Sequence, residues 1–167
     1  NEDGELKHYP GSPWLASHFL GTDDRITCFE LHPTEHAFVS KTFEGDDRVL
    51  IRKADGYRGA LTLAPRAKES FAVLVDPSYE TLDDLKALIE WVPKALRRWP
   101  KAVIMIWLPL FKDGREDEFG AFLAELETGA IAGARWPDDP SSTTALAGTA
   151  MISYRVSDTV VEAGHRI

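Results

Sequence analysis

Short apolar runs alternate with amphipathic stretches along the chain, a pattern typical of strands separated by helices. The apolar runs predict strands at residues 26–31, 49–54, 71–75, 102–107 and 148–154. The stretches between them predict helices at residues 34–43, 57–63, 82–99 and 116–127, and residues 136–144 are expected to form a loop. Strand and helix therefore alternate through most of the chain.

The helix expected over residues 82–99 has the clearest pattern, because its apolar residues recur at helical spacing. Acidic residues occupy its first turn and arginines its last, which complements the helix dipole; they are Asp83, Asp84, Arg97 and Arg98. Two more helix starts are indicated by capping residues. Thr34 is expected to cap one helix, and Ser12, which precedes Pro13, is expected to cap another.

Apolar strands separated by helices indicate a mostly parallel sheet with helices on both faces. We therefore predict an α/β, doubly wound domain over residues 1–156, followed by a tail at residues 157–167. In such a sheet, ligands bind beyond the carboxyl ends of the strands. The residues that follow each predicted strand are accordingly the first place to look for a binding or catalytic site.

Charge and cysteine content narrow the classes of partner. The 167 residues include 19 Lys and Arg against 27 Asp and Glu, a formal net charge of −8, which disfavours non-specific coating of nucleic acid. An RNA substrate would need a local basic patch or a basic segment outside this chain. One cysteine excludes a multi-cysteine zinc site and indicates a reducing, cytoplasmic compartment. The five histidines are scattered, so no metal is expected, and no apolar run is long enough to predict a membrane span.

Three consecutive predicted strands are followed by a carboxylate: Glu30, Asp55 and Asp76. A carboxylate at this place can accept hydrogen bonds from ribose hydroxyls. The alternative for each one alone is a turn carboxylate that caps the next helix. Three of them at adjacent strand ends favour a nucleoside-type cofactor.

The turn Asp76-Pro77-Ser78-Tyr79 is the most specific feature, because it directly follows an apolar strand. Pro77 stops the strand. The Asp76 carboxylate and nearby main-chain carbonyls can accept the protons of an aromatic amine, and the Tyr79 ring can stack on the base that carries it. The alternative is an ordinary Asp-Pro turn with Tyr79 as a half-buried aromatic residue.

Five blocks occur in order along the chain: residues 7–13 (Lys-His-Tyr-Pro-Gly-Ser-Pro), 30–33 (Glu-Leu-His-Pro), 54–57 (Ala-Asp-Gly-Tyr), 76–80 (Asp-Pro-Ser-Tyr-Glu) and 107–109 (Trp-Leu-Pro). As a set they resemble the RlmJ-type 23S ribosomal RNA adenine-N(6) methyltransferase family, whose members have also been labelled as proteins for catabolism of external DNA. The resemblance covers residues 7–154.

The resemblance implies a class I, Rossmann-like methyltransferase fold that uses S-adenosylmethionine. It implies that Ser12, Glu30, Asp55 and Gly56 contact the cofactor. Asp76 would be the catalytic carboxylate, helped by the Pro77 carbonyl, with Tyr79 stacked on the flipped adenine. The substrate would be ribosomal RNA, protein-free or partly assembled, with no membrane or metal involved.

Two departures from the family pattern change the expectations. Ser78 stands where the family usually has a second proline. The family's first strand, with its Gly-containing turn, is expected before residues 9–13 and is not found in this chain, which is interpreted as the C-terminal two-thirds of such an enzyme. A non-catalytic, Rossmann-like remnant that binds RNA or a partner protein is therefore the alternative. A nicotinamide oxidoreductase is weakened by the lack of a G-x-G-x-x-G motif.

Overall fold

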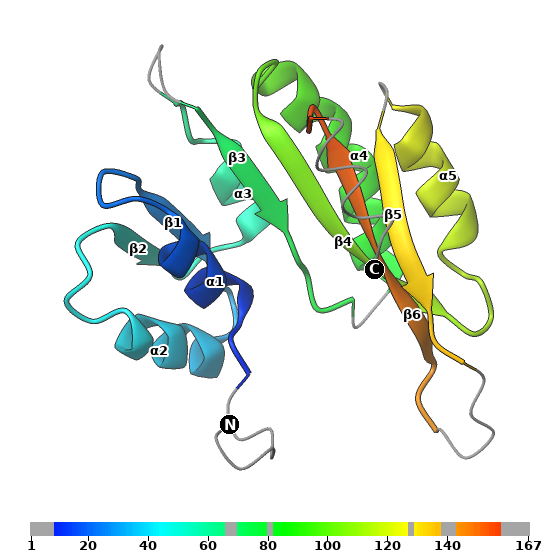
Figure 1. Ribbon diagram of the computed structural model, residues 1–167, viewed down its shortest axis with the longest axis horizontal. Helices are drawn as coiled ribbons and strands as arrows, with labels where there is room; N and C mark the ends of the chain where they lie inside the picture. The colour runs from blue at the N-terminus through cyan, green and yellow to red at the C-terminus, as the bar shows by residue number, and fades with distance from the viewer. Residues whose placement is uncertain (1–8, 66–69, 80–81, 127–128, 138–142, 158–167) are drawn as a thin grey trace. The chain divides into compact units, whose positions relative to one another are not determined.

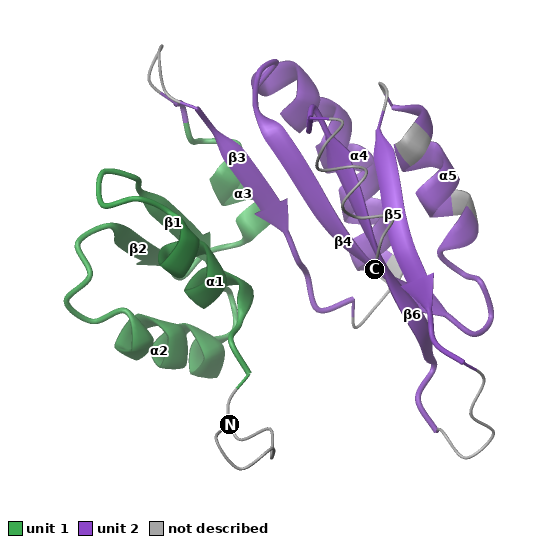
Figure 2. Cartoon of the chain, in the orientation of Figure 1, with its two compact units in different colours: residues 1–63 green, residues 64–167 purple. Residues whose placement is uncertain are grey.

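The computed structural model describes residues 9–65, 70–79, 82–126, 129–137 and 143–157. The chain divides into two compact units, residues 1–63 and residues 64–167 (Figure 2). We describe each unit by itself. The single domain expected over residues 1–156 stays a prediction, and residues 158–167 of the expected tail lie outside the described residues.

Unit 1 is built on two parallel strands (Figure 1). Its elements, in chain order, are α1 (Ser12–Phe19), β1 (Ile26–Phe29), α2 (Pro33–Thr42), β2 (Val49–Arg52) and α3 (Gly56–Ala60). The pairing runs from Ile26 opposite Val49 to Phe29 opposite Arg52. Both predicted strands are confirmed, and each ends two residues earlier than predicted.

Unit 1 buries little apolar surface within itself. Ala60 is the one buried hydrophobic residue among its described residues, whereas Phe19 and Phe38 are 80% and 71% exposed. Long-range polar contacts therefore matter for how its helices are held to its strands.

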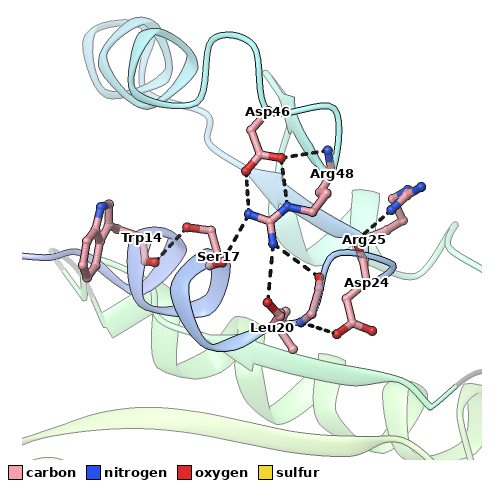
Figure 3. A network of polar contacts seen from close by, with 8 residues as sticks. Trp14, Ser17, Leu20, Asp24, Arg25, Asp46 and Arg48 are labelled. Carbon is pink, nitrogen blue, oxygen red and sulfur yellow. Dashed lines mark hydrogen bonds and ion pairs between the residues drawn. The ribbon is translucent and has the colours of Figure 1, made fainter.

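Arg48, one residue before β2, provides such contacts by binding the end of α1 (Figure 3). Its guanidinium donates to the main-chain carbonyl oxygens of Ser17 and Leu20 at 3.3 and 3.4 Å. Carbonyls at a helix C-terminus have no partner within the helix, so an arginine satisfies them well. Asp46 holds the guanidinium in place, with Nε to Oδ1 at 3.0 Å and Nη2 to Oδ2 at 2.7 Å.

Unit 2 contains a four-stranded sheet in the order β3-β4-β6-β5 (Figure 1). Its elements are β3 (Ala72–Val75), α4 (Leu82–Arg98), β4 (Val103–Phe111), α5 (Asp117–Glu125), β5 (Ala130–Arg135) and β6 (Leu146–Tyr154). β3 is parallel to β4, whereas β6 is antiparallel to both β4 and β5. The α/β class is confirmed, and the sheet of this unit is mixed.

The core of unit 2 lies between the long helix and alternate residues of the two central strands. In β4 and β6 buried residues alternate with half-buried ones, as expected when one face of a sheet is covered. The helical spacing predicted for residues 82–99 is confirmed by α4, which continues through Pro93. Buried members of this core include Leu88, Trp91, Val92, Leu96, Trp99, Ile104, Ile106, Leu108, Phe119, Leu123, Ile152 and Tyr154.

Two predicted helix caps are wrong, and one strand was not predicted. Thr34 and Ser12 are not N-caps: the caps are His32 and Gly11, one or two residues earlier. The reason is proline, whose fixed φ suits the first helical turn, so α2 already begins at Pro33. Strand β5 was not predicted, because its sequence Ala-Ile-Ala-Gly-Ala-Arg is poor in β-branched and aromatic residues.

The Arg48–Asp46 pair predicts a pH dependence of stability. The hydrogen bond from Arg48 holds the pKa of Asp46 below its ordinary value. A lowered folded-state pKa means that the pair stabilises the fold above the unfolded pKa of about 3.9, and that this contribution is lost as the pH falls through the folded pKa. We expect Asp46→Asn to lower the free energy of unfolding at neutral pH, and the difference from the parent to shrink towards zero in acid. Urea unfolding at a series of pH values measures this.

Asp47→Asn is the matched control, because it removes the same charge one position away from the pair and Asp47 is exposed. An equal loss of stability in both variants would show that net charge, and not the contact with Arg48, is responsible.

Candidate functional site

In unit 1, the parallel pairing brings two of the predicted carboxylates to one edge. Glu30 directly follows β1, and its main-chain N–H donates to the Arg52 carbonyl at 3.0 Å, which extends the ladder by one bond. Asp55 lies three residues beyond the end of β2. Both residues are half-buried and lie at the carboxyl end of the pair, where α/β sheets bind ligands.

Each carboxylate uses one oxygen to order its own turn. Glu30 Oε1 accepts from the His32 N–H at 2.7 Å. Asp55 Oδ1 accepts from the N–H groups of Tyr57 and Arg58 at 2.8 and 3.3 Å, so Asp55 is the N-cap of α3. The second oxygen of each, Oε2 and Oδ2, accepts no hydrogen bond within the part of the chain that the structure describes. The capping role is therefore present and leaves an acceptor for a ligand.

Helix α3 is packed closely on β1 through two glycines. A Cβ added to Gly56 would lie 3.5 Å from the Phe29 Cβ, an ordinary contact. A Cβ added to Gly59 would lie 2.3 Å from Phe29 Cε1, which is too close. The absence of a side chain at position 59 thus lets α3 approach β1, and this approach fixes where Asp55 and Gly56 lie.

Ser12 is the first residue of α1 and is half-buried. The opposite end of this helix is bound by Arg48, at the amino end of β2. Unit 1 also has an open groove of about 610 Å³ at the amino ends of its strands, lined by residues that include Arg25, Asp46 and Leu50. This groove lies at the other end of the sheet from Glu30 and Asp55.

In unit 2, Asp76 directly follows β3. Val75 is the last residue of that strand, is 9% exposed and pairs with Ile106 of β4. Asp76 itself is exposed. Because the two strands are parallel and in register, Asp76 leaves the sheet beside Trp107.

Tyr79 is held against β4. Its backbone has φ 51°, in the left-handed region that a bulky residue rarely adopts. Its hydroxyl donates to the Trp107 carbonyl oxygen, and the two rings lie 5.6 Å apart with a 58° angle between their planes. The Trp107 indole Nε1–H in turn donates to Thr149 Oγ1 of β6 at 2.5 Å. The sequence alone predicted neither of these roles for Trp107 and no role for Thr149; the one signal was the block at residues 107–109.

The structure therefore brings the predicted residues together in two groups. Glu30, Asp55 and Gly56 share one edge in unit 1, and Asp76, Pro77 and Tyr79 form one turn in unit 2.

Burial raises the pKa of the Cys28 thiol in β1, which keeps it protonated and unreactive.

Metal binding and membrane insertion are two further possibilities. His32 and His36 are four residues apart, a spacing that can suit metal ligands. Within the described residues, however, no group of three or more His, Cys, Asp or Glu side chains is placed to hold a metal ion. None of the described helices is long and apolar enough to cross a membrane.

Two solved structures have a fold similar to that of this chain. A protein of Legionella pneumophila superposes with a TM-score of 0.78 over 93% of this chain and 60% of its own, at 24% identity. An S-adenosylmethionine-dependent O-methyltransferase of Thermotoga maritima superposes with a TM-score of 0.52 over 89% of this chain and 57% of its own, at 14% identity. The fold is thus that of the Rossmann-like, class I methyltransferases.

The sequence comparison identifies the family. The family model described as "Ribosomal RNA large subunit methyltransferase D, RlmJ" matches residues 1–152, and the chain belongs to this family. The ribosomal RNA large subunit methyltransferase J of Escherichia coli is 30% identical over 110 residues, 66% of this chain and 39% of that protein. The Haemophilus influenzae protein of the same name is 29% identical over 106 residues, 64% and 38% of the two chains. The chain spans about two fifths of the length of these relatives.

Gly59 gives a direct test of how α3 is positioned. We expect Gly59→Ala to destabilise the fold by about 1–3 kcal/mol, since the new methyl group would displace the Phe29 ring. Chemical denaturation followed by circular dichroism measures the loss.

Gly120→Ala in α5 is the control, because its Cβ would lie 3.6 Å from Leu108 Cδ2 and so fits. A helix gains up to about 1 kcal/mol from such a change, so this variant should be neutral or more stable. Equal stability of Gly59→Ala and the parent would show that α3 is not held closely on Phe29.

Proposed function

We propose that this protein transfers a methyl group from S-adenosylmethionine to the exocyclic amine, N6, of an adenine in 23S ribosomal RNA. The observation that carries the proposal is the Asp76–Tyr79 turn, which directly follows the parallel strand β3 and is anchored on β4, in a chain of the RlmJ family. Membership alone would leave the chemistry open, because the chain spans only part of its curated relatives.

The residues of unit 1 fit the cofactor by the chemistry of their acceptors. S-adenosylmethionine, when bound, supplies a methyl group already carried on a good leaving group, the sulfonium. Glu30 Oε2 would accept from the ribose hydroxyls, while Asp55 and Gly56 would lie beside the adenine ring of the cofactor. Ser12, in the first turn of α1, would contact its amino-acid end. The turns of Glu30 and Asp55 are ordered by their own main-chain hydrogen bonds, so these acceptors are placed before any ligand arrives.

The residues of unit 2 would hold the target base. The Asp76 carboxylate and the Pro77 carbonyl would accept the two amine protons, which directs the nitrogen lone pair away from both acceptors. Asp76 would then take the proton that the nitrogen gives up on methylation. The Tyr79 ring would stack on the adenine, an interaction worth about 1–3 kcal/mol for a base on an aromatic ring. The work of these residues is alignment, which can account for several orders of magnitude in rate.

We also infer the setting of the reaction. Ribosomal RNA, protein-free or partly assembled, is the proposed substrate, since a flipped adenine must reach Asp76. Because the sequence carries a formal net charge of −8, we expect RNA to be bound by a local basic patch or by a basic segment outside this chain. The single cysteine supports a cytoplasmic location.

The proposal predicts that Asp76→Asn lowers methyl transfer by about a hundredfold or more, because the uncharged amide can neither stabilise the positive charge that develops on the amine nor take up its proton. The measurement is transfer of tritium from labelled S-adenosylmethionine to unmodified 23S ribosomal RNA. Binding of the cofactor should be unchanged in the same variant.

Asp83→Asn is the matched control, since Asp83 is exposed in the first turn of α4 and pairs with Lys86 at 3.0 Å. It should transfer methyl groups at the parental rate. Full activity of Asp76→Asn would refute the catalytic role, and a parent that binds RNA but never transfers a methyl group would favour a non-catalytic RNA-binding protein.

A further inference from the structure

Strand β4 continues where its parallel neighbour stops. The pairing of β3 with β4 ends at Val75 and Ile106, whereas β4 runs on to Phe111. Trp107 is the first residue of β4 past the last such pair, and its carbonyl accepts the Tyr79 hydroxyl. The Tyr79 hydroxyl thus donates a hydrogen bond to the edge of β4 just beyond the last residue that pairs with β3.

The Trp107 side chain is itself fixed from the other neighbour of β4. Thr149 of β6 stands opposite Pro109, two residues along from Trp107, and its Oγ1 accepts the indole N–H at 2.5 Å. Trp107 and Thr149 are half-buried and alternate with buried residues of their strands, so both side chains lie on the sheet face away from the core residues Ile106 and Leu108. The Tyr79 ring meets the indole on this face.

A contiguous series of contacts therefore runs from Thr149 through Trp107 to Tyr79. Tyr79 needs such support, because a bulky residue in the left-handed region is strained and persists only when its surroundings hold it there. Without the support, the turn could relax to a more common backbone conformation. Such a relaxation would move the Tyr79 ring and, three residues earlier, Asp76.

We propose that Trp107 and Thr149 are positioning residues for the reaction: Thr149 orients the Trp107 indole, which together with the Trp107 carbonyl holds Tyr79 and the Asp76 turn in place. This inference rests on the proposed methyl transfer. Neither residue touches the reacting atoms in this scheme. Their loss should lower the turnover rate, because the base is held less well, and should leave cofactor binding by the unit 1 residues unchanged.

The first test reads the position of Tyr79 without any reaction. Thr149→Val keeps the shape of the side chain and removes the acceptor, and Thr149→Ser keeps the hydroxyl as the matched control. With the protein labelled by 3-fluorotyrosine, the Tyr79 fluorine resonance, assigned by its loss in Tyr79→Phe, should shift in Thr149→Val and stay near its parental position in Thr149→Ser. An unshifted resonance in Thr149→Val would overturn the inference.

The second test is kinetic. Thr149→Val should lower kcat for ribosomal RNA by about tenfold, since small misplacements at a reacting centre are costly, with KM for S-adenosylmethionine within twofold of the parent. Tyr79→Phe removes the donor to Trp107 and should also lower kcat. Because both changes act on the same contact series, the double variant should lose much less than the product of the two single effects. Losses that multiply would show that Thr149 does not act through Tyr79.

The two tests separate failure of this inference from failure of the proposed function. A parent protein that transfers no methyl group to ribosomal RNA, while the fluorine resonance still shifts in Thr149→Val, would overturn the proposed function and confirm the support of Tyr79. An active parent whose kcat is unaffected by Thr149→Val would overturn the positioning role alone. A fall in kcat accompanied by an equal rise in KM for the cofactor would indicate general loss of structure, and would also count against the positioning role.

Discussion

The early end of the pairing between β3 and β4 is the constraint on which the proposed catalytic turn of unit 2 depends. Parallel register delivers Asp76 to the edge of the sheet beside Trp107, and the longer β4 offers the Trp107 carbonyl just beyond the last strand pair. The Tyr79 hydroxyl binds that carbonyl and draws the turn back onto the sheet. Strand β4 has neighbours on both sides and is a rigid element of the sheet. It thus both determines where Asp76 leaves the sheet and supports the Tyr79 ring, and side chains held by a rigid element in this way are positioned precisely.

Unit 1, whose residues are proposed to bind the cofactor, is ordered in a different way, because it buries few apolar residues. Its turns are ordered by polar groups that satisfy main-chain atoms locally: Arg48 at the end of α1, Glu30 after β1 and Asp55 at the start of α3. In Glu30 and Asp55, one carboxylate oxygen accepts main-chain N–H groups of the turn, and the other oxygen can accept from a ligand. A capping role and a binding role are therefore compatible at these positions.

The sequence predicted the strands, the long helix and the turn at Asp76 well, since these depend on local composition and spacing. It failed at helix starts, where Pro13 and Pro33 lie within the first turn, and at β5, whose small residues carry no strand signal. The contacts of Trp107 could not be predicted in the same way. Its partners Tyr79 and Thr149 are 28 and 42 residues away, and only the folded sheet brings the three together.

Identification of the methylated atom is the most direct test of the proposal that the Asp76 turn receives an adenine amine. Unmodified 23S ribosomal RNA would be incubated with the protein and S-adenosylmethionine carrying a deuterated methyl group, digested to nucleosides and analysed by mass spectrometry. We expect the label in N6-methyladenosine. A label on a ribose oxygen or on a ring carbon would contradict the proposed role of the Asp76 carboxylate and the Pro77 carbonyl, because these two acceptors match the two protons of an amine, whereas a ribose hydroxyl offers one proton and a ring carbon offers no hydrogen-bonding proton.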